Sequence, residues 1–344
     1  MMFAEPNDYL PCATLPMLRL RARLLHAVRA FFDERGYFEV DTPLLSHDRP
    51  VDPHVEPFVI EGRSGPRYLQ TSPEFAMKRL LAAGATAIYQ VGHVFRAGEL
   101  GTRHNPEFTM IEWYRAGDTH VEQMQVVEDL VGAVFRDAVE ARHGASQIPL
   151  DFGAKQVPAA PFRRTSYRDA FASHAGCDVM LLGPAELAEL ARSRNVANPE
   201  SLKASDRDGW LNLLLAELVE PNLGIDRPEF LFDYPASQAA LARIRCEDPP
   251  VTERFELYLD GIELCNGYHE LTDAEELRRR IDAESQRRVA GGEAPLPLSS
   301  RLLAAMDAGL PACTGVALGF DRLVMLAAGA ASVREVIAFP FDRA

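Results

Sequence analysis

The fold is decided by residues 89–115, which begin YQVGHVFR, continue through the polar loop AGELGTR and end HNPEFTMIEWYR. The first run is rich in β-branched and aromatic residues, and the last run alternates between two faces. Two such runs joined by a loop with two glycines predict an antiparallel hairpin. Glu112 and Tyr114 lie on one face of its second strand. This face is either part of a functional site or an ordinary solvated strand face.

The same stretch resembles motif 2 of the class II aminoacyl-tRNA synthetases, specifically of the lysyl type. The resemblance rests on Phe95-Arg96, a gap of seven residues, the run HNPEFTM and then Glu112-Trp113-Tyr114. It extends from about Leu18 to Ala344 and is nearest to the elongation factor P lysine ligases, which are truncated lysyl-tRNA synthetase paralogues. It implies an α+β class II catalytic domain, a mostly antiparallel sheet flanked by helices. We expect an N-terminal arm (residues 1–17), a catalytic domain (residues 18–344) and no anticodon-binding domain.

Length and composition limit the class of protein. The 344 residues suffice for one large domain or two, and a hydrophobic content of 47% supports a substantial core. No apolar run reaches the roughly 18 residues that span a bilayer, and no signal-peptide pattern is present at the N-terminus. The five cysteines lack a CxxC spacing, which indicates reduced thiols in a cytoplasmic protein. The net charge of −14 disfavours a polyanionic partner such as tRNA.

Motif 1 is expected near the N-terminus. Apolar positions from Leu18 to Phe32 follow helical spacing, and Gly36 is placed to end that helix. A strand at residues 37–40 then leads into Asp41-Thr42-Pro43. In the class II family this element forms the interface of a homodimer. Without the other motifs, an ordinary packed helix and strand would be the favoured interpretation.

A candidate substrate contact follows at Ser72, Pro73 and Glu74. Pro73 and Glu74 suit the first turn of a helix, where the dipole favours a carboxylate, so helix capping is one interpretation. The resemblance implies the other, in which Ser-Pro-Glu contacts the substrate and Glu74 meets an amino group. We favour the second interpretation because the rest of the pattern accompanies it.

Arg96 is the first catalytic candidate. A class II enzyme forms an adenylate by attack of a carboxylate on the α-phosphate of ATP, and an arginine suits the negative charge that builds on the phosphoryl oxygens. The family continues Arg-Asn-Glu, whereas this chain has Arg96, Ala97, Gly98 and Glu99. The acidic residue is therefore one position late, and backbone contacts from the loop are left to hold the adenine. The resemblance also implies that Asn105 contacts ATP and that Tyr114 contacts the substrate amine.

A second hairpin is expected at residues 254–271, because Asp260-Gly261 favours a type I′ turn. Glu256 and Glu263 then lie on one face as diagonal neighbours, roughly 7–8 Å apart. Carboxylates this close repel each other unless a cation lies between them, and oxygen ligands near a nucleotide suggest Mg²⁺. The lysyl family uses these two glutamates for the metal. The alternative is two solvated glutamates on an edge strand.

The same hairpin carries the amino-acid pocket that the resemblance implies, with Asn266 and Glu270 as substrate contacts and Leu264 near the nucleotide. Strict alternation would place Asn266 and Glu270 on the face opposite Glu263, so we expect a bulge or bend near Gly267. Cys265 replaces the glycine of lysyl-tRNA synthetases and the usual alanine of the elongation factor P ligases. The larger side chain narrows the pocket and favours β-lysine over α-lysine.

Motif 3 is expected at residues 315–326, GVALGFDRLVML. Small residues let a strand backbone approach a flat ligand, and the N-terminus of the following helix favours phosphate. The resemblance implies that Gly319 packs on adenine and that Arg322 meets the γ-phosphate. Arg322 is the second catalytic candidate.

The remaining elements are simpler. We expect helices over residues 121–139, 166–171, 184–193, 206–219, 272–289 and 300–308, with a loop at 141–162 and a strand at 229–234. Thr272 and Glu275 form a predicted capping box. The middle portion is expected to be an insertion in the same catalytic domain.

These features together predict an enzyme that uses ATP and Mg²⁺ to convert a lysine-type amino acid, α-lysine or (R)-β-lysine, into its adenylate. No covalent nucleophile or general base is needed, because the attacking carboxylate is already ionised. About 17 residues precede the first helix, too few for an anticodon-binding barrel. We therefore expect a protein acceptor, a lysine of elongation factor P. A minimal lysyl-tRNA synthetase and a catalytically silent regulatory paralogue are the alternatives, although both motif arginines are present.

Overall fold

The structure is a computed structural model that describes all residues except 1–8, 52–54, 64, 144–154, 293 and 298–299. The chain forms two compact units, each described here by itself. Unit 1 comprises Met1–Asp118, Asp129–Val157 and Thr272–Ala344. Unit 2 comprises Thr119–Glu128 and Pro158–Leu271. The first residues of the expected N-terminal arm and half of the loop expected at 141–162 lie outside the described part of the chain.

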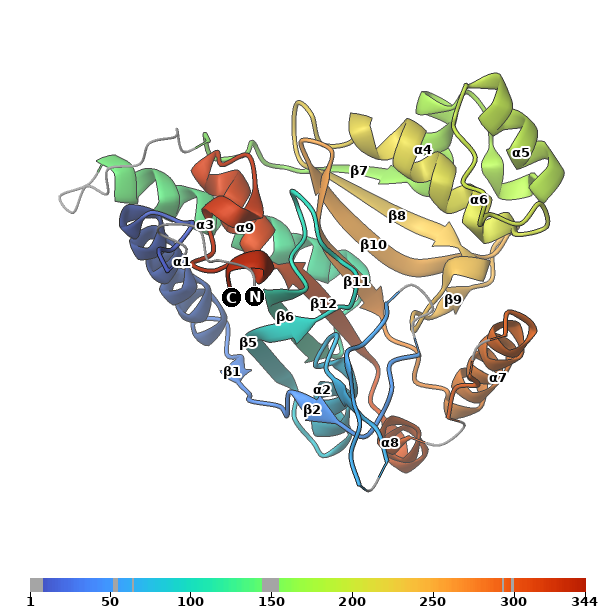
Figure 1. The fold of residues 1–344 in the computed structure, drawn as a ribbon, viewed down its shortest axis with the longest axis horizontal. Helices are drawn as coiled ribbons and strands as arrows, with labels where there is room; N and C mark the ends of the chain where they lie inside the picture. Colours follow the sequence, from blue (N-terminus) through green and yellow to red (C-terminus); the bar gives the residue numbers. More distant parts are fainter. Residues whose placement is uncertain (1–8, 52–54, 64, 144–154, 293, 298–299) are drawn as a thin grey trace, which may run out of the picture. The chain divides into compact units, whose positions relative to one another are not determined.

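Unit 1 contains a four-stranded array in the order β1 (Phe38–Glu39), β5 (Ala87–Phe95), β6 (Glu107–Ala116) and β12 (Cys313–Gly319). The predicted hairpin is confirmed, because β5 and β6 pair antiparallel from Ala87↔Arg115 to Phe95↔Glu107. β12 pairs antiparallel with β6, and β1 pairs parallel with β5. Figure 1 shows these strands beside the blue helix α1 (Leu15–Asp33).

Helix α1 covers the face of this sheet that carries Tyr89 and Trp113. The Phe32 ring stacks on Tyr89 with centroids 4.7 Å apart and lies 5.1 Å from Trp113. The buried positions of α1 recur at helical spacing (Met17, Leu20, Leu24, Val28, Phe31, Phe32). Since successive strand residues point to opposite faces, Glu112 and Tyr114 belong to the other face. The helix begins three residues earlier than predicted, because Thr14 caps it and Pro16 occupies its first turn.

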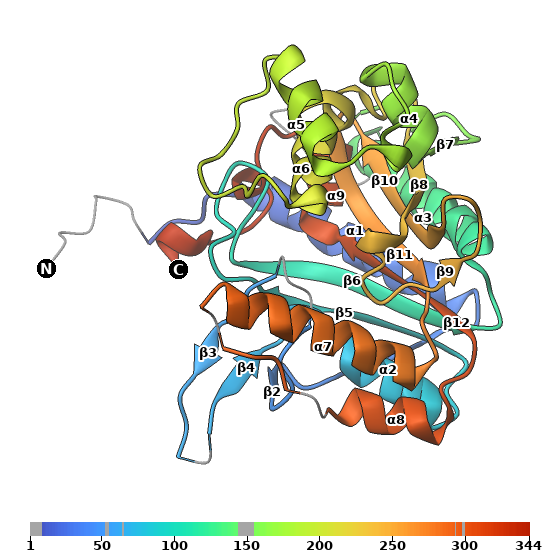
Figure 2. The same cartoon turned by 90° about the vertical axis from the view of Figure 1, so that its right-hand side faces the viewer.

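A small three-stranded antiparallel sheet, β2 (Leu45–Ser46), β4 (Arg67–Leu69) and β3 (Val59–Ile60), precedes α2 (Glu74–Ala82). Helices α2 and α8 (Arg301–Gly309) lie side by side, as Figure 2 shows. Helix α7 (Ala274–Ala290) is also present as predicted, but its N-cap is Asp273 and not Thr272. The Asp273 side chain accepts hydrogen bonds from the backbone amides of Glu275 and Glu276. Aspartate is at least as favourable as threonine at an N-cap position, so the helix begins after Asp273.

Motif 3 has the predicted strand-to-helix form. β12 ends at Gly319, and α9 (Phe320–Ala328) begins at the next residue. Asp321 anchors this helix within unit 1, because its carboxylate accepts a hydrogen bond from the Thr109 backbone amide and pairs with Arg21 at 2.6 Å. The start of α9 is thereby fixed against β6 and α1. The helix expected at 121–139 is α3 (His120–His143), whose first residues belong to unit 2.

Unit 2 is built on β11 (Ile262–His269), β10 (Val251–Leu259), β8 (Glu229–Pro235) and β7 (Arg163–Ser166), in that order, with β9 (Ile244–Arg245) also paired to β10. All pairs are antiparallel except β7 with β8. The predicted turn at Asp260-Gly261 is confirmed, since both residues have positive φ, as a type I′ turn requires. The sheet is therefore mostly antiparallel in both units, as predicted.

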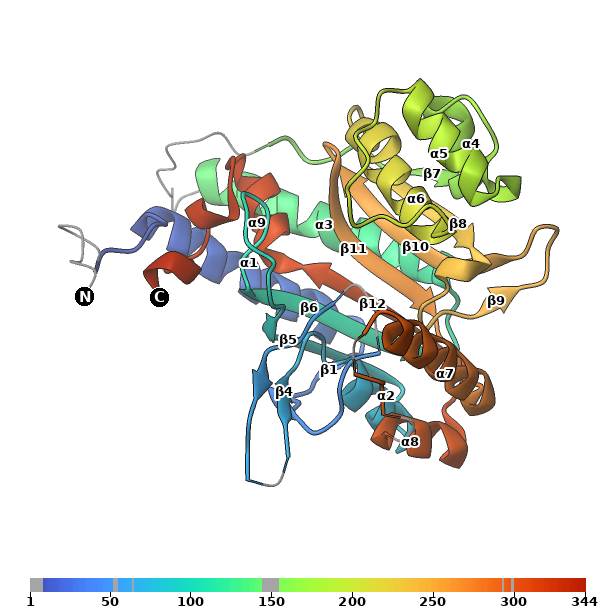
Figure 3. The same ribbon diagram turned by 45° about the vertical axis from the view of Figure 1, so that its right-hand side comes forward.

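Helices α4 (Tyr167–His174), α5 (Pro184–Ser193) and α6 (Arg207–Leu214) gather over β8 and β10 (Figure 3). Their apolar residues form one core with the sheet, centred on Tyr167, Phe171, Trp210, Leu231 and Tyr234. A π-helical turn (Leu215–Val219) extends α6 to the predicted end near Pro221. Short 3-10 turns occupy Val179–Leu181, Glu220–Asn222, Ala236–Gln238, Val333–Glu335 and Phe341–Arg343. The fold class predicted from the sequence is confirmed in its secondary structure.

Candidate active site

A buried carboxylate, Glu112, is the centre of a polar cluster in unit 1, formed with Ser72, Glu74, Lys78 and Tyr114. Its Oε2 accepts a hydrogen bond of 2.7 Å from the Ser72 hydroxyl, and its Oε1 accepts one of 2.7 Å from the Tyr114 hydroxyl. The residue is only 2% exposed. Thus two predicted substrate contacts, Ser72 before α2 and Tyr114 on β6, meet at one carboxylate. The sequence had indicated Glu112 only as part of a notable strand face.

Glu74 belongs to the same cluster and has a lysine as partner. The Lys78 ammonium donates to Glu74 Oε1 at 2.6 Å, one turn along α2, and Lys78 is 1% exposed. The Glu74 backbone amide donates to Ser72 Oγ, which also connects the start of α2 to the cluster. Pro73 is the N-cap residue of α2. Ser72, Pro73 and Glu74 therefore start the helix, and Ser72 and Glu74 also belong to a polar cluster, whereas their contact with the substrate stays a prediction.

The charge state of Glu112 follows from this environment. Burial, with a contribution from the nearby Glu74 carboxylate, raises the pKa of Glu112 to about 7, and hydrogen bonds from Tyr114 and Ser72 and the charge of Lys78 only partly offset the rise. Two carboxylates facing one ammonium leave room for one further cation. The charges of this cluster therefore suit a cationic amine that would complete the charge balance.

Arg96 lies at the end of β5 in unit 1. Its guanidinium lies 5.2 Å from the centre of the Phe108 ring, donates to the Thr71 backbone carbonyl and pairs with Glu99 at 3.7 Å. The side chain is about one quarter exposed. Glu99, the acidic residue that is one position late, thus still reaches the motif 2 arginine.

Arg322 lies in the first turn of α9, also in unit 1. Its Nε donates to the Arg103 carbonyl, and its Nη2 lies 2.5 Å from His104 Nε2. Burial and the nearby charges of Arg322, Arg96 and Arg103 lower the pKa of His104, against the opposing effect of Glu99. The charges of both predicted catalytic arginines, Arg96 and Arg322, therefore lower the pKa of the same imidazole. The neutral ring can accept the hydrogen bond from Arg322.

The other predicted nucleotide contacts in unit 1 differ in how many contacts they already make with the rest of the protein. Asn105 is buried, with its amide donating to the Glu107 carbonyl and its oxygen accepting from the Phe341 amide, so the side chain shapes the loop. The Ala97 amide donates to the Glu56 carbonyl, and Gly98 has φ +81°. A Cβ at Gly319 would meet only the Arg322 side chain, at 3.8–3.9 Å. The described protein thus gives no steric reason for this glycine, as expected where a ligand approaches.

In unit 2 the predicted metal ligand Glu256 is surrounded by donors. Tyr234 and Tyr258 each donate to its Oε2 at 2.6 Å, and Arg254 donates to its Oε1 at 2.5 Å. Asn266 adds a longer bond of 3.3 Å to the same Oε1. A carboxylate has about four lone-pair positions. A metal ion at Glu256 would therefore have to replace one of these four hydrogen bonds, and the long bond from Asn266 is the weakest of them.

The predicted bulge is present, but its position differs from the prediction. Tyr258 pairs with Glu263 whereas Leu257 pairs with Cys265, so Leu264 is the extra residue. This shift places Asn266 opposite Glu256 and on the face that also carries Glu263. Gly267 has another role. A Cβ there would lie 2.4 Å from the Phe255 ring, so the glycine makes room for the aromatic residue opposite it.

Of the remaining predicted substrate contacts, Glu270 is buried and Asn266 is half-buried. Glu270 is 2% exposed and forms a bridge with Ala242 just beyond β11. The Asn266 side-chain oxygen is also buried and has no hydrogen-bond partner among the described residues, which suits a donor such as an amine. Cys265 is 2% exposed, and burial raises the pKa of its thiol, so it is a small uncharged group in this strand.

The comparison with protein families identifies the fold. Residues 13–343 match the family described as tRNA synthetases class II (D, K and N). The chain belongs to the class II tRNA synthetases. The resemblance predicted from motifs 1, 2 and 3 is therefore confirmed, and it extends over nearly all of the chain.

Comparison with individual class II proteins shows a more specific similarity than the family match does. The chain is 43% identical over 347 aligned residues to elongation factor P--(R)-beta-lysine ligase of Klebsiella pneumoniae subsp. pneumoniae, an alignment that covers 99% of this chain and 100% of the relative. A protein of the same name from Enterobacter sp. (strain 638) is also 43% identical, and one from Salmonella paratyphi B is 42% identical, both over the same shares of the chains. The predicted similarity to elongation factor P ligases is thus confirmed.

Sequence reasoning missed two residues of this class II site. Lys78 was not a candidate, although its spacing of four from Glu74 on a helix is a known signal for an ion pair. His104 was quoted only as part of motif 2, and its contact with Arg322 links residues 218 positions apart, which no local pattern reveals. Among the described residues, no helix is both long and apolar enough to cross a bilayer.

Proposed function

We propose that this chain uses ATP to activate a lysine-type amino acid, with (R)-β-lysine as the favoured substrate, and transfers it to a lysine side chain of elongation factor P. The observation that carries the proposal is the 43% identity, over nearly the full length of both chains, to proteins named for this reaction. The polar cluster of unit 1 supports it independently, because Glu74 and Glu112 together with Lys78 suit a cationic amine.

The proposed first step is an in-line displacement. A carboxylate oxygen of the amino acid attacks the α-phosphorus of ATP, the bond from that phosphorus to the bridging oxygen breaks, and pyrophosphate leaves. Arg96 and Arg322 stabilise the negative charge that builds on the phosphoryl oxygens. No residue has to remove a proton, since the attacking group is already ionised. The protein contributes position and charge stabilisation.

In the proposed second step, the neutral ε-amine of a protein lysine attacks the carbonyl carbon of the adenylate. An amide bond forms, AMP leaves with the electrons of the acyl–oxygen bond, and the amine loses a proton. The amino groups of the activated substrate stay bound to the carboxylates throughout, which keeps its carbonyl in place. Glu74, Glu112 and Tyr114 are the groups that we assign to this role in unit 1, and Asn266 and Glu270 in unit 2.

We assign the Mg²⁺ ligands of the family to Glu256 and Glu263. Both offer carboxylate oxygens, the donors that this hard cation prefers, and the bulge keeps them on one face of β10 and β11. Glu256 would exchange its long bond from Asn266 for the ion. When bound, Mg²⁺ supplies charge neutralisation for the phosphates.

The preference for β-lysine rests on Cys265. A thiol at this position occupies more volume than the glycine of lysyl-tRNA synthetases. It is buried on β11 opposite Leu257, on the face away from Asn266, so it would act on the substrate through the position of the strand. We propose that the shifted strand excludes an α-amino group and tolerates the β-amino group, which is displaced by one carbon. The ATP-binding groups, by contrast, do not distinguish the two isomers.

We further propose that the protein is a cytoplasmic homodimer that does not charge tRNA. The dimer follows from motif 1, which α1 and β1 represent here, and the cytoplasm is where a translation factor would be modified. The acidic charge of −14 supports a protein acceptor over a nucleic acid. The closest alternative is a minimal lysyl-tRNA synthetase.

ATP–pyrophosphate exchange tests the proposal and separates it from the alternatives. We expect exchange with (R)-β-lysine to exceed exchange with α-lysine, and no aminoacylation of tRNA. A Cys265→Gly variant should gain exchange with α-lysine, whereas a Cys246→Gly variant, changed at an exposed cysteine, should not. Exchange with neither isomer would indicate a silent paralogue, and charging of tRNA would indicate a synthetase.

A further inference from the structure

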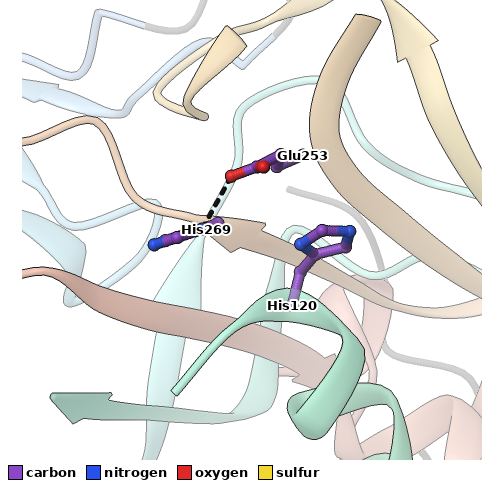
Figure 4. Close-up of side chains that lie close together, drawn as sticks. All are labelled: His120, Glu253 and His269. Atoms are coloured by element: carbon purple, nitrogen blue, oxygen red, sulfur yellow. Dashed lines mark ion pairs between the residues drawn. The ribbon is translucent and has the colours of Figure 1, made fainter. Parts of the chain in front are cut away.

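Three side chains of unit 2 that no part of the proposed reaction uses converge on one point. His120 is the first residue of α3, Glu253 lies on β10 and His269 is the last residue of β11. Figure 4 shows the three side chains facing one another, with the His269–Glu253 ion pair as a dashed line. The two atoms of this pair, His269 Nδ1 and a Glu253 oxygen, are 2.6 Å apart.

We propose that His120, Glu253 and His269 form a binding site for a divalent transition-metal ion, and that Zn²⁺ is the ion its ligand set fits. One ligand atom from each residue can be chosen so that all three lie within 4.8 Å of one another. Two imidazoles and one carboxylate are a ligand set that Zn²⁺ uses in proteins, with a fourth position left for water. Mg²⁺ and Ca²⁺ prefer oxygen ligands and are disfavoured here.

The geometry needs only small adjustments. Ligands bound at about 2.1 Å in a tetrahedral site lie roughly 3.4 Å apart. The widest separation in the cluster would have to close by about 1–1.5 Å, and the short His269–Glu253 contact would have to open by under about 1 Å. Rotations of the His120 ring and of the Glu253 carboxylate provide movements of this size without a change in the backbone.

Burial gives an independent reason for a ligand. His120 is 6% exposed, and its Nδ1 is buried without a hydrogen-bond partner among the described residues. Such a group is costly to leave unsatisfied, and each exception in a folded protein calls for a specific explanation. Burial also lowers the pKa of His120 to about 4, so the ring is neutral. A neutral imidazole is the form that binds metal ions.

The charges around the cluster leave room for a cation. Arg243 and Arg245 lie 3.8 Å and 4.0 Å from the Glu253 oxygens, and Arg164 also acts on His120. These are long contacts, and the Arg243 side chain is 59% exposed and therefore well screened. Arg245 has closer partners in Asp233, at 2.7 Å, and Glu247, at 2.6 Å. The Glu253 charge is thus not neutralised by a short arginine contact.

The ion would hold together parts of the chain that are far apart in sequence. It would join the first residue of α3 to β10 and to the end of β11, where the His269 carbonyl already accepts a hydrogen bond of 2.8 Å from the Arg243 amide. The next residue is Glu270, a proposed substrate contact. The proposed role is therefore to fix the end of β11, and it does not depend on the reaction assigned above.

The test uses protein without a histidine tag, stripped with a chelator and equilibrated by dialysis against Zn²⁺ in the absence of ATP and amino acids. We expect one bound zinc per chain by elemental analysis and a melting temperature that rises with zinc concentration. His120→Gln should weaken binding by at least about 100-fold, because it removes a ligand itself and not only a group that orients one. Glu253→Gln should act in the same direction.

His174→Gln is the matched control, since His174 lies on α4 of the same unit and outside the cluster. It should bind zinc as the parent protein does. The visible spectrum of the cobalt-loaded protein adds a check, because the five cysteines could also bind metal. Less than stoichiometric binding by the parent protein, binding that His120→Gln leaves unchanged, or a thiolate-to-cobalt band would each overturn the proposal.

Discussion

Glu112 is a carboxylate buried between two hydroxyl donors, Ser72 and Tyr114, and close to a second carboxylate, Glu74. Its pKa of about 7 means that an ammonium group that binds beside it binds mainly to the ionised form. Binding should therefore release a proton near neutral pH. The affinity should rise by about tenfold from pH 6 to pH 8, as the ionised fraction grows from roughly one tenth to nine tenths.

Calorimetric titration of the lysine substrate in buffers of different ionisation enthalpy would measure both effects. Glu112→Gln should bind more weakly and lose the pH dependence. Glu107→Gln, at an exposed position on the same strand, should keep it. An affinity that depends on pH equally in the parent protein and in Glu112→Gln would contradict this account.

The same carboxyl group makes stability depend on pH in the absence of substrate. Because the pKa of Glu112 is raised from 4.5 to about 7 on folding, the folded state binds more protons than the unfolded state between these values. The free energy of unfolding should therefore fall as the pH rises from 4.5 to 7 and then level off. The contribution is at most about 3 kcal/mol, and chemical denaturation of Glu112→Gln should show a correspondingly flatter profile.

Arg96 and Arg322 are expected to act on the transition state for adenylate formation. Replacing either with alanine should lower the rate of ATP–pyrophosphate exchange by about 10²–10³-fold, as loss of one charge-stabilising donor does in other enzymes. Arg192→Ala, which removes an exposed partner of Glu189 on α5, should leave the rate unchanged. Exchange that survives either substitution at near-parental rates would remove that arginine from the proposed mechanism.

At the scale of single residues, the sequence predicted the groups that belong to local motifs. Ser72, Glu74 and Tyr114 were found because each lies in a short, recognisable run. Lys78 was missed because a lysine on a helix is usually solvated, and only the tertiary structure shows that this one is buried. The His120, Glu253 and His269 cluster could not be predicted, since its members come from separate segments with no common spacing.

At the scale of elements, the hairpin of β10 and β11 shows what turn chemistry can and cannot predict. Asp260-Gly261 was enough to fix the pairs nearest the turn. The alternation of side chains then required a bulge to bring Asn266 onto the face of Glu263, but it did not show which residue would be the extra one. In the structure the extra residue is Leu264. Gly267 attracted the prediction because glycines mark bulges, whereas the packing of Phe255 explains it here.

This explanation predicts a specific loss of stability. Gly267→Ala would place a methyl group within 2.4 Å of the Phe255 ring, so we expect the free energy of unfolding to fall by about 1–3 kcal/mol. Gly101→Ala is the control, because no atom lies within 4 Å of the added Cβ. Equal stability of the two variants in denaturant would show that close packing is not the reason for Gly267. A Phe255→Leu change should partly rescue Gly267→Ala.

At the scale of the whole molecule, the fold class followed from three motifs that the chain carries in order. The family match over residues 13–343 confirms that these motifs belong to one class II synthetase framework. Separation into two compact units was not predicted, because no linker or shift in composition marks the points where the chain passes between them. Composition is averaged along the chain, whereas the units are assembled from segments that alternate in sequence.

The central claim is that this framework attaches a lysine-type amino acid to a protein and not to tRNA. The most direct measurement is the intact mass of elongation factor P after incubation with enzyme, ATP and either (R)-β-lysine or α-lysine. The account predicts a gain of one lysyl residue on a lysine side chain, faster with (R)-β-lysine and absent without ATP. An unchanged mass under conditions in which the enzyme aminoacylates tRNA would contradict it.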